Sequence, residues 1–182
     1  MPTSTYVILG VGWLVWITPF LLAYRKKQAA TQVDRRARWG MVLIAVGYSC
    51  LWQGKFWERS LPGWRVPLGA FFLILAATLA WTATRALGRQ WRVDAGLISD
   101  HELVTSGPYG LVRHPIYTSM LCMLLGTGFL ITTLPLLLLA TLFFVIGTEF
   151  RVRIEENLLT AHFGEQFRDY QKRVGAYVPF LK

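Results

Sequence analysis

Residues 116–147, IYTSMLCMLLGTGFLITTLPLLLLATLFFVIG, decide the fold because 32 consecutive positions carry no charged side chain. One helix of that length would measure roughly 48 Å at 1.5 Å per residue, well beyond the ~30 Å hydrocarbon core of a bilayer. The two threonines at 132–133 can cap a new helix, and Pro135 is tolerated in its first turn. The run therefore predicts a helical hairpin with spans over about 115–131 and 133–150.

Three further apolar stretches precede this hairpin. Residues 6–24 are uncharged and match one crossing; the basic run at 25–27 follows them, the reverse of the charge order of a cleaved signal, so we expect this span to be retained. The second stretch, 39–57, is weaker because Lys55 lies near its end, and the third covers 66–84. Because over half the residues are hydrophobic and only 16% are charged, against roughly 25% in soluble domains, the sequence predicts an all-α integral membrane protein with about five transmembrane helices.

Lysine and arginine are distributed unevenly between these spans. The connecting segments on alternate sides hold 16 and three of them, which by the positive-inside rule predicts an outside N-terminus and a cytoplasmic C-terminus. Cytoplasmic arginines and lysines near anionic lipid account for most of the net charge of +9, so no nucleic-acid partner is expected. Residues 1–182 then form a single membrane domain whose loop 85–114 and tail 151–182 both face the cytoplasm.

A polar turn stands directly against the start of the hairpin, in VTSGPYGLVRHPIY at 104–117. Glycine and proline at 107–110 indicate the turn, and Pro115 suits the first turn of the helix that follows. Arg113 and His114 therefore lie at a helix N-terminus, where unpaired N–H groups and the helix dipole favour an anion such as an amino-acid carboxylate. The alternative is a plain loop-to-helix boundary with an arginine held at the lipid headgroups.

The segment that follows the hairpin is predicted to be an amphipathic tail helix. From Phe150 onward apolar residues recur at spacings of three to five, and Gly164 is expected to break or bend the helix. Arg151 and Glu155 are four residues apart and share a face, whereas Glu156 lies about 100° round the helix. The alternative is an interfacial helix whose charges are merely solvated.

Several separated motifs in a fixed order resemble a known family: His-Glu-Leu-Val at 101–104, the Arg-His-Pro-Ile-Tyr run at 113–117, Arg151, and the glutamate pair at 155–156. Together they are similar to the isoprenylcysteine carboxyl methyltransferases, and phospholipid N-methyltransferases share the same marks. The resemblance covers roughly residues 85–182, whereas the N-terminal part matches only in hydropathy.

The resemblance implies methyl transfer from S-adenosylmethionine to a lipophilic acceptor. It implies that Arg151 contacts the substrate, and we add Arg113 as a candidate for binding the cofactor carboxylate or for closing the pocket. The aromatic face of Tyr109 or Tyr117 can stabilise a sulfonium cation, and the carboxylate of Glu155 can hold an ammonium group or a ribose hydroxyl. The cofactor-binding positions that the resemblance implies are His101, Glu102, Leu103, Val104, Tyr109, His114, Pro115, Ile116, Tyr117 and Glu155.

The acceptor itself stays open between a carboxylate, an amine and a thiol. A carboxylate, such as that of an isoprenylcysteine, needs no deprotonation and could be oriented by a bidentate contact with Arg151. An amine, such as a phospholipid ethanolamine, must first lose a proton, and Glu156 or His101 would then be the candidate base. We expect a lipid or lipophilic small molecule to reach the site from the bilayer, while the cofactor arrives from the cytoplasm; the sequence makes no prediction of oligomeric state.

This chain departs from the family pattern at two positions. Asp94 stands where the eukaryotic carboxyl methyltransferases have a glutamine, so either the loop is realigned or that cofactor contact is lost. Ser119 stands where glycine is common, two residues after Tyr117. The chain is also shorter than the eukaryotic members, which favours a prokaryotic cell-membrane protein.

Two other classes of protein share some of these sequence features. Membrane sterol reductases share a similar Arg-His-Pro-x-Tyr turn and use NADPH, but the cluster at 151–156 favours the methyltransferases. A non-catalytic carrier would need polar residues in mid-span, where almost none occur. Cys50 and Cys122 have no partner at metal-ligand or redox spacing, so we expect packing roles for both and no metal site.

Overall fold

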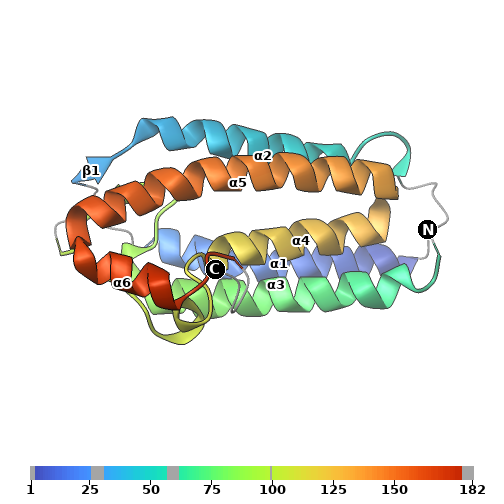
Figure 1. Ribbon diagram of the computed structural model, residues 1–182. Coiled ribbons are helices and arrows are strands. Elements are labelled where there is room, and N and C mark those ends of the chain that lie inside the picture. The colour runs from blue at the N-terminus through green and yellow to red at the C-terminus, as the bar shows by residue number, and fades with distance from the viewer. Residues whose placement is uncertain (1–2, 26–30, 57–61, 99, 178–182) are drawn as a thin grey trace.

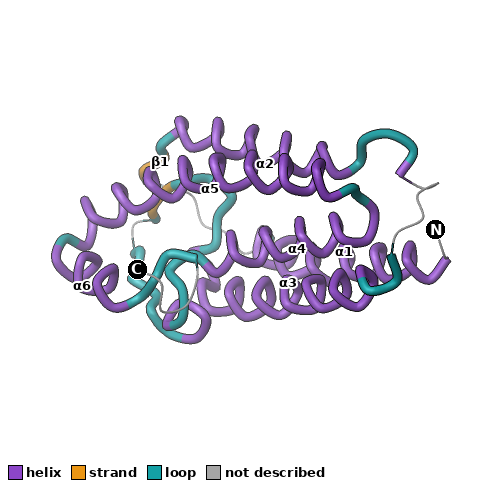
Figure 2. Tube along the Cα trace, turned by 45° about the vertical axis from the view of Figure 1, so that its right-hand side comes forward, coloured by secondary structure: helices purple, strands orange, loops and turns teal. Residues whose placement is uncertain are grey.

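The computed structural model describes residues 3–25, 31–56, 62–98 and 100–177. The long helices run side by side in two layers, as Figures 1 and 2 show. The bounds of these helices are α1 Thr3–Tyr24, α2 Arg38–Leu51, α3 Arg65–Leu87, α4 Pro115–Ile131 and α5 Leu134–Phe163. One layer holds α1, α3 and α4, and the other pairs α2 with α5.

The short strands, the α3–α4 loop and α6 lie at one end of the bundle, whereas the α2–α3 and α4–α5 connections lie at the other (Figure 1). Strand β1 (Gln32–Val33) pairs antiparallel with β2 (Gly96–Leu97), so the α1–α2 connection holds the loop that follows α3. Neither two-residue strand was expected from the sequence, because such short strands leave no hydrophobic alternation. The remaining short elements are the 3₁₀ turns η1 Arg35–Ala37, η3 Gly88–Gln90 and η4 Gly107–Gly110, and the helix α6 Glu165–Arg173.

The helices confirm an all-α membrane protein. In the described part of the chain, α1, α3 and α5 are long and apolar enough to cross a bilayer, and α4 is a shorter apolar helix. Their outward faces carry large apolar side chains such as Leu14, Ile74 and Leu138, each more than 60% exposed. A soluble protein would hide most of these side chains, whereas lipid solvates them.

The predicted hairpin is present with its turn at the expected place. Helix α4 ends at Ile131, Thr133 is the N-cap of α5, and a proline lies in the first turn of α5. The Thr133 side chain makes no capping hydrogen bond, however. Thr132 instead donates its buried hydroxyl to the carbonyl of Leu51, so the hairpin turn is tied to the end of α2.

Two boundaries differ from the sequence expectations. Helix α2 ends at Leu51, before the expected 57, because the chain turns through Gly54 at φ 65°; residue 57 lies outside the described residues. Helix α5 does not end at the membrane edge near Phe150 but continues to Phe163, since the intervening sequence contains no glycine or proline. Gly164, with φ 56°, then turns the chain into α6 as predicted.

Close packing between α2 and α5 positions the polar end of α5. A Cβ atom on Gly40 would lie 2.5 Å from the carbonyl oxygen of Gly147 and 2.5 Å from Cγ of Arg151. Only glycine allows the two backbones to approach this closely. This close approach fixes the position of Arg151 along the bundle. Its guanidinium points toward the end of the bundle that carries the loops.

Candidate active site

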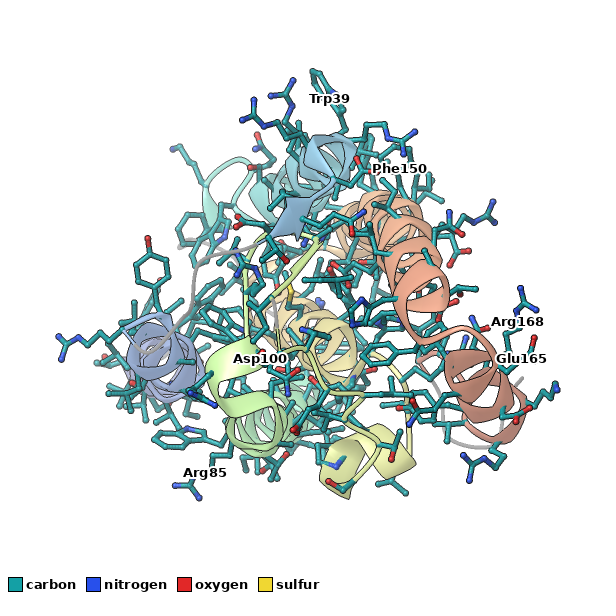
Figure 3. All side chains as sticks on the ribbon, turned by 90° about the vertical axis from the view of Figure 1, so that its left-hand side faces the viewer. Trp39, Arg85, Asp100, Phe150, Glu165 and Arg168 are labelled. Carbon is teal, nitrogen blue, oxygen red and sulfur yellow. The ribbon has the colours of Figure 1, made fainter. Side chains whose placement is uncertain are left out.

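A cavity of about 480 Å³ lies at the end of the bundle that carries the loops. Its size falls in the range of small-molecule sites, roughly 300–1,000 Å³. Figure 3 looks at this end, with Trp39 and Arg85 pointing outward on different sides of it. Pro115 and Glu156 do not line the cavity, but the other sequence-predicted site residues do: His101, Glu102, Leu103, Val104, Tyr109, Arg113, His114, Ile116, Tyr117, Arg151 and Glu155.

Three of these side chains join α4 to α5 through a closed set of contacts. The Tyr117 hydroxyl donates to Oε1 of Glu155 at 2.5 Å and accepts from Nε of Arg151 at 2.6 Å. Arg151 also pairs directly with Glu155 at 3.0 Å, on the helix face that their four-residue spacing makes them share. Because the Arg151 side chain is only 5% exposed, these partners hold a nearly buried charge in one orientation.

A second polar cluster lies behind the cavity wall. Glu156 accepts hydrogen bonds from Nε of Arg113 at 2.9 Å and from Nε2 of His114 at 3.0 Å, and its other oxygen accepts from Gln171 at 2.8 Å. Arg113 further donates to the carbonyl of Val174. Of the two roles expected for Arg113, these contacts favour closing the pocket.

The tail covers the cavity by pairing with the turn before α4. The backbone N–H groups of Arg113 and His114 donate to the carbonyls of Gly175 and Ala176 at 2.8 and 3.0 Å. On α6, the buried Tyr170 hydroxyl donates to the carbonyl of Tyr109 at 2.5 Å. Burial raises the pKa of Tyr170 to about 12, so this hydroxyl keeps its proton at neutral pH. Two segments about sixty residues apart therefore form one wall.

The loop after α3 supplies the opposite wall. Its carbonyl at Val93 accepts from Nη2 of Arg151 at 2.7 Å, and the side-chain oxygen of Gln90 accepts from the N–H of Glu102 at 2.7 Å. Asp94, which stands where the family has glutamine, also lines the cavity and pairs with Arg92 at 3.1 Å. Gln90 also lines the cavity, so a glutamine is present there four residues before Asp94, the position at which the family resemblance leads us to expect one.

His101 lines this cavity and carries a buried polar atom, Nδ1, without a hydrogen-bond partner in the described residues. Burial lowers the pKa of the imidazole, and the nearby positive charges of His162 and Arg92 lower it further, so the neutral form is favoured. A buried nitrogen without a partner is costly, and a ligand with a polar edge would satisfy it.

The aromatic wall formed by α1 was not found by sequence reasoning. Trp16 and Phe20 line the cavity with ring centroids 5.0 Å apart, and Trp91 continues the row 5.7 Å from Phe20. On the far side Phe167 and Tyr170 of α6 line it too. Helix α1 is apolar all round and has no motif, so its sequence gave no signal of which face meets the site.

The described residues hold no cluster of three or more histidine, cysteine, aspartate or glutamate side chains that could bind a metal. Cys122 is buried and Cys50 half-buried, and neither forms a disulfide.

A family model described as phospholipid methyltransferase matches residues 64–166, more than half of the chain. The chain belongs to this family. The matched region begins at the start of α3 and ends in α6, so it contains the Tyr117, Arg151 and Glu155 contacts, Glu156 with its partners Arg113 and His114, and most of the cavity wall. It leaves out α1 and α2.

Curated relatives carry several different names. The chain is 34% identical over 124 residues to a protein-S-isoprenylcysteine O-methyltransferase of Tribolium castaneum, covering 65% of this chain and 43% of the relative. It is 31% identical over 148 residues to the cobalt-zinc-cadmium resistance protein CzcN of Cupriavidus metallidurans, covering 79% and 62%. It is 33% identical over 114 residues to a methanethiol S-methyltransferase of Pseudomonas deceptionensis, covering 60% and 42%. The chain thus spans about half the length of these relatives.

Proposed function

We propose that this protein is an integral membrane methyltransferase that uses S-adenosylmethionine to methylate a lipophilic acceptor. The observation that carries the proposal is the single cavity that the 101–117 segment and the 151–170 segment line together. The names of the Tribolium and Pseudomonas relatives, both methyltransferases, support the reaction class.

The residues present fit S-adenosylmethionine. His101 offers a buried Nδ1 without a partner in the described residues, suited to a polar edge of the adenine. Among the described residues, Tyr117 and Arg151 both donate to Oε1 of Glu155, which leaves Oε2 for an ammonium group or a ribose hydroxyl. The rings of Tyr109 and Tyr117 line the same cavity and suit a sulfonium. When bound, S-adenosylmethionine supplies a methyl group activated by the positive charge on its sulfur.

The chain contributes mainly alignment and exclusion of water. Methyl transfer of this type is an in-line displacement, so positioning of donor and nucleophile supplies most of the acceleration. Arg151 is held by Tyr117, Glu155 and the Val93 carbonyl, and no hydrogen bond from the described residues reaches its Nη1. We infer that Nη1 orients the acceptor, and that the tail, latched by Tyr170, keeps water out.

The need for a base depends on the acceptor. A carboxylate or thiolate acceptor needs none. For an amine, Glu156 is poorly placed, because it does not line the cavity and already accepts from Arg113, His114 and Gln171. Of the two, only His101 lines the cavity, and with an amine acceptor its Nδ1 would serve as the base in place of the contact with adenine.

The acceptor would reach the cavity from the lipid between α1 and α2. Helix α1 packs on α3 and α2 packs on α5, and the two lie apart at the end shown in Figure 3. Leu21 and Tyr24 line the cavity yet are 59% and 53% exposed on the outer face of α1. These side chains support a lateral opening for an apolar molecule. We further propose that this end of the bundle faces the cytoplasm, where the positive-inside rule puts it.

The class of cofactor is tested by thermal unfolding of the purified protein in detergent. S-adenosylmethionine and S-adenosylhomocysteine should each stabilise it, by about 2.7 kcal/mol at a hundred times Kd, whereas NADPH should not. The Glu155→Gln variant should bind S-adenosylhomocysteine at least about tenfold more weakly, because a charge-assisted contact is lost. Glu165→Gln is the matched control, since the Glu165 side chain is 73% exposed on α6 and does not line the cavity.

Stabilisation by NADPH alone would indicate a reductase and contradict the proposed methyltransferase. No response to any of the three ligands would reject the cofactor assignment. Once binding is established, methyl transfer to isoprenylcysteine carboxylates, phosphatidylethanolamine and alkyl thiols separates the acceptor classes.

A further inference from the structure

The cavity ends abruptly on its membrane side. Counted from the loop-bearing end, its innermost lining residues are Trp16 on α1, Met41 on α2 and Met120 on α4. Met120 lies five residues after the start of α4 at Pro115, which corresponds to roughly 8 Å along the helix. The cavity therefore reaches only about one and a half turns into the bundle.

Packed aromatic side chains fill the space below this level. Trp13, one turn further into the bundle than Trp16, contacts it edge-on with ring centroids 5.5 Å apart. Trp13 also meets the ring of Tyr48 from α2 at 5.8 Å, and the Tyr48 hydroxyl donates to the carbonyl of Met120 at 2.7 Å. Neither Trp13 nor Tyr48 lines the cavity. An apolar chain bound in the cavity would thus meet Trp16 first and find no free space behind it.

The indole of Trp16 is fixed by a buried hydrogen-bond relay. Its Nε1 donates to the hydroxyl of Ser119 at 2.8 Å, and that hydroxyl donates to the carbonyl of Ala76 at 2.9 Å. Trp16 is 7% exposed and Ser119 fully buried, so breaking the relay would leave a buried donor unpaired. Ser119 is the position at which the family resemblance leads us to expect glycine, which has no hydroxyl to hold an indole.

We propose that Trp16, held by Ser119, is a specificity-determining residue that closes the membrane end of the acceptor site. It limits how much of an apolar chain can be buried inside the bundle; a longer chain must leave between α1 and α2 into lipid. This inference rests on the proposed function, because it assigns the apolar end of the same cavity to the acceptor.

The test measures acceptor binding in detergent with S-adenosylhomocysteine present. The probes are N-acetyl-S-alkyl-L-cysteines with chains from butyl to pentadecyl. In the wild-type protein Kd should fall about fourfold with each methylene until the chain reaches Trp16, and then level off. In Trp16→Ala the fall should continue over further carbons, so that the longest chains bind at least about tenfold more tightly than to the wild type.

Three variants keep the result interpretable. Trp81→Ala is the matched control: its indole also bonds to α1, at the Val15 carbonyl, but it does not line the cavity, and its chain-length profile should match the wild type. Trp16→Phe keeps a ring but loses the hydrogen bond, and Ser119→Ala frees the indole. In both variants, the chain length at which Kd levels off should be longer than in the wild type, by less than in Trp16→Ala. These two variants therefore test the proposal if Trp16→Ala does not fold.

Each result has one reading. If S-adenosylhomocysteine binds and the levelling point stays where it is in every Trp16 and Ser119 variant, the assignment of Trp16 is overturned and the proposed function stands. If S-adenosylhomocysteine binds but wild-type affinity shows no dependence on chain length, the assignment is equally overturned. If the wild-type protein binds neither S-adenosylhomocysteine nor any probe, the proposed function itself fails.

Discussion

Removal of one hydroxyl, in Tyr117→Phe, tests whether the contacts between α4 and α5 hold the site together. The hydroxyl bonds two charged groups, Arg151 at 2.6 Å and Glu155 at 2.5 Å. Hydrogen bonds to charged groups contribute about 1.5–3 kcal/mol each. Because Arg151 and Glu155 keep their direct contact at 3.0 Å, neither charge is left alone, and we expect a loss of about 2–3 kcal/mol in unfolding free energy.

The assay is reversible unfolding in mixed detergent, with Tyr48→Phe as the matched control. Tyr48 makes one hydrogen bond to a neutral carbonyl, so its loss should be about 0.5–1.5 kcal/mol. The Tyr117→Phe protein should also lose turnover more than cofactor affinity, since Arg151 is freed. If Tyr117→Phe is no less stable than Tyr48→Phe and its turnover is unchanged, the contacts among Tyr117, Arg151 and Glu155 do not hold the site together.

Three further predictions follow from single contacts. Gly40→Ala should cost about 1–3 kcal/mol of stability by pushing α2 from α5, whereas Gly10→Ala, whose Cβ meets nothing within 4 Å, should not destabilise; equal melting temperatures would contradict this. Tyr170→Phe should cost about 1–2 kcal/mol and weaken binding of S-adenosylhomocysteine by loosening the tail; calorimetry showing unchanged affinity would argue against the latch. Because the pKa of His101 is lowered in the folded protein, the unfolded chain takes up a proton at higher pH, and the unfolding free energy should fall as the pH drops below about 6.5. In a pH series of unfolding curves, His101→Asn should reduce this pH dependence. The same pH dependence in the variant and the wild type would show that His101 does not cause it.

The sequence was sufficient for those parts of the molecule that depend on local signals. The hairpin turn follows from the length of the uncharged run and from Pro135, although no threonine side chain caps α5, and the kink at Gly164 follows from a single glycine in a helical pattern. The four-residue spacing of Arg151 and Glu155 predicted that they share a helix face, and there they form an ion pair. Each of these signals lies within one or two helical turns.

Features that depend on tertiary contact could not be predicted in the same way. The pairing of β1 with β2 joins two-residue segments more than sixty positions apart. Trp16 lies in a uniformly apolar helix, and only the packing of α1 on α3 and α4 turns it toward the cavity. The partners of Glu156 likewise come from the turn before α4 and from α6, so its hydrogen bonds could not be anticipated from a helical wheel.

The central claim is that one S-adenosyl donor lies between the 101–117 segment and the 151–170 segment. Photolabelling with an azido-adenine analogue of S-adenosylmethionine, followed by mass-spectrometric mapping, tests it most directly. We predict label in peptides from both segments, lost together when S-adenosylhomocysteine competes. Label confined to one segment, or found mainly on α3 between 65 and 84, would contradict the account.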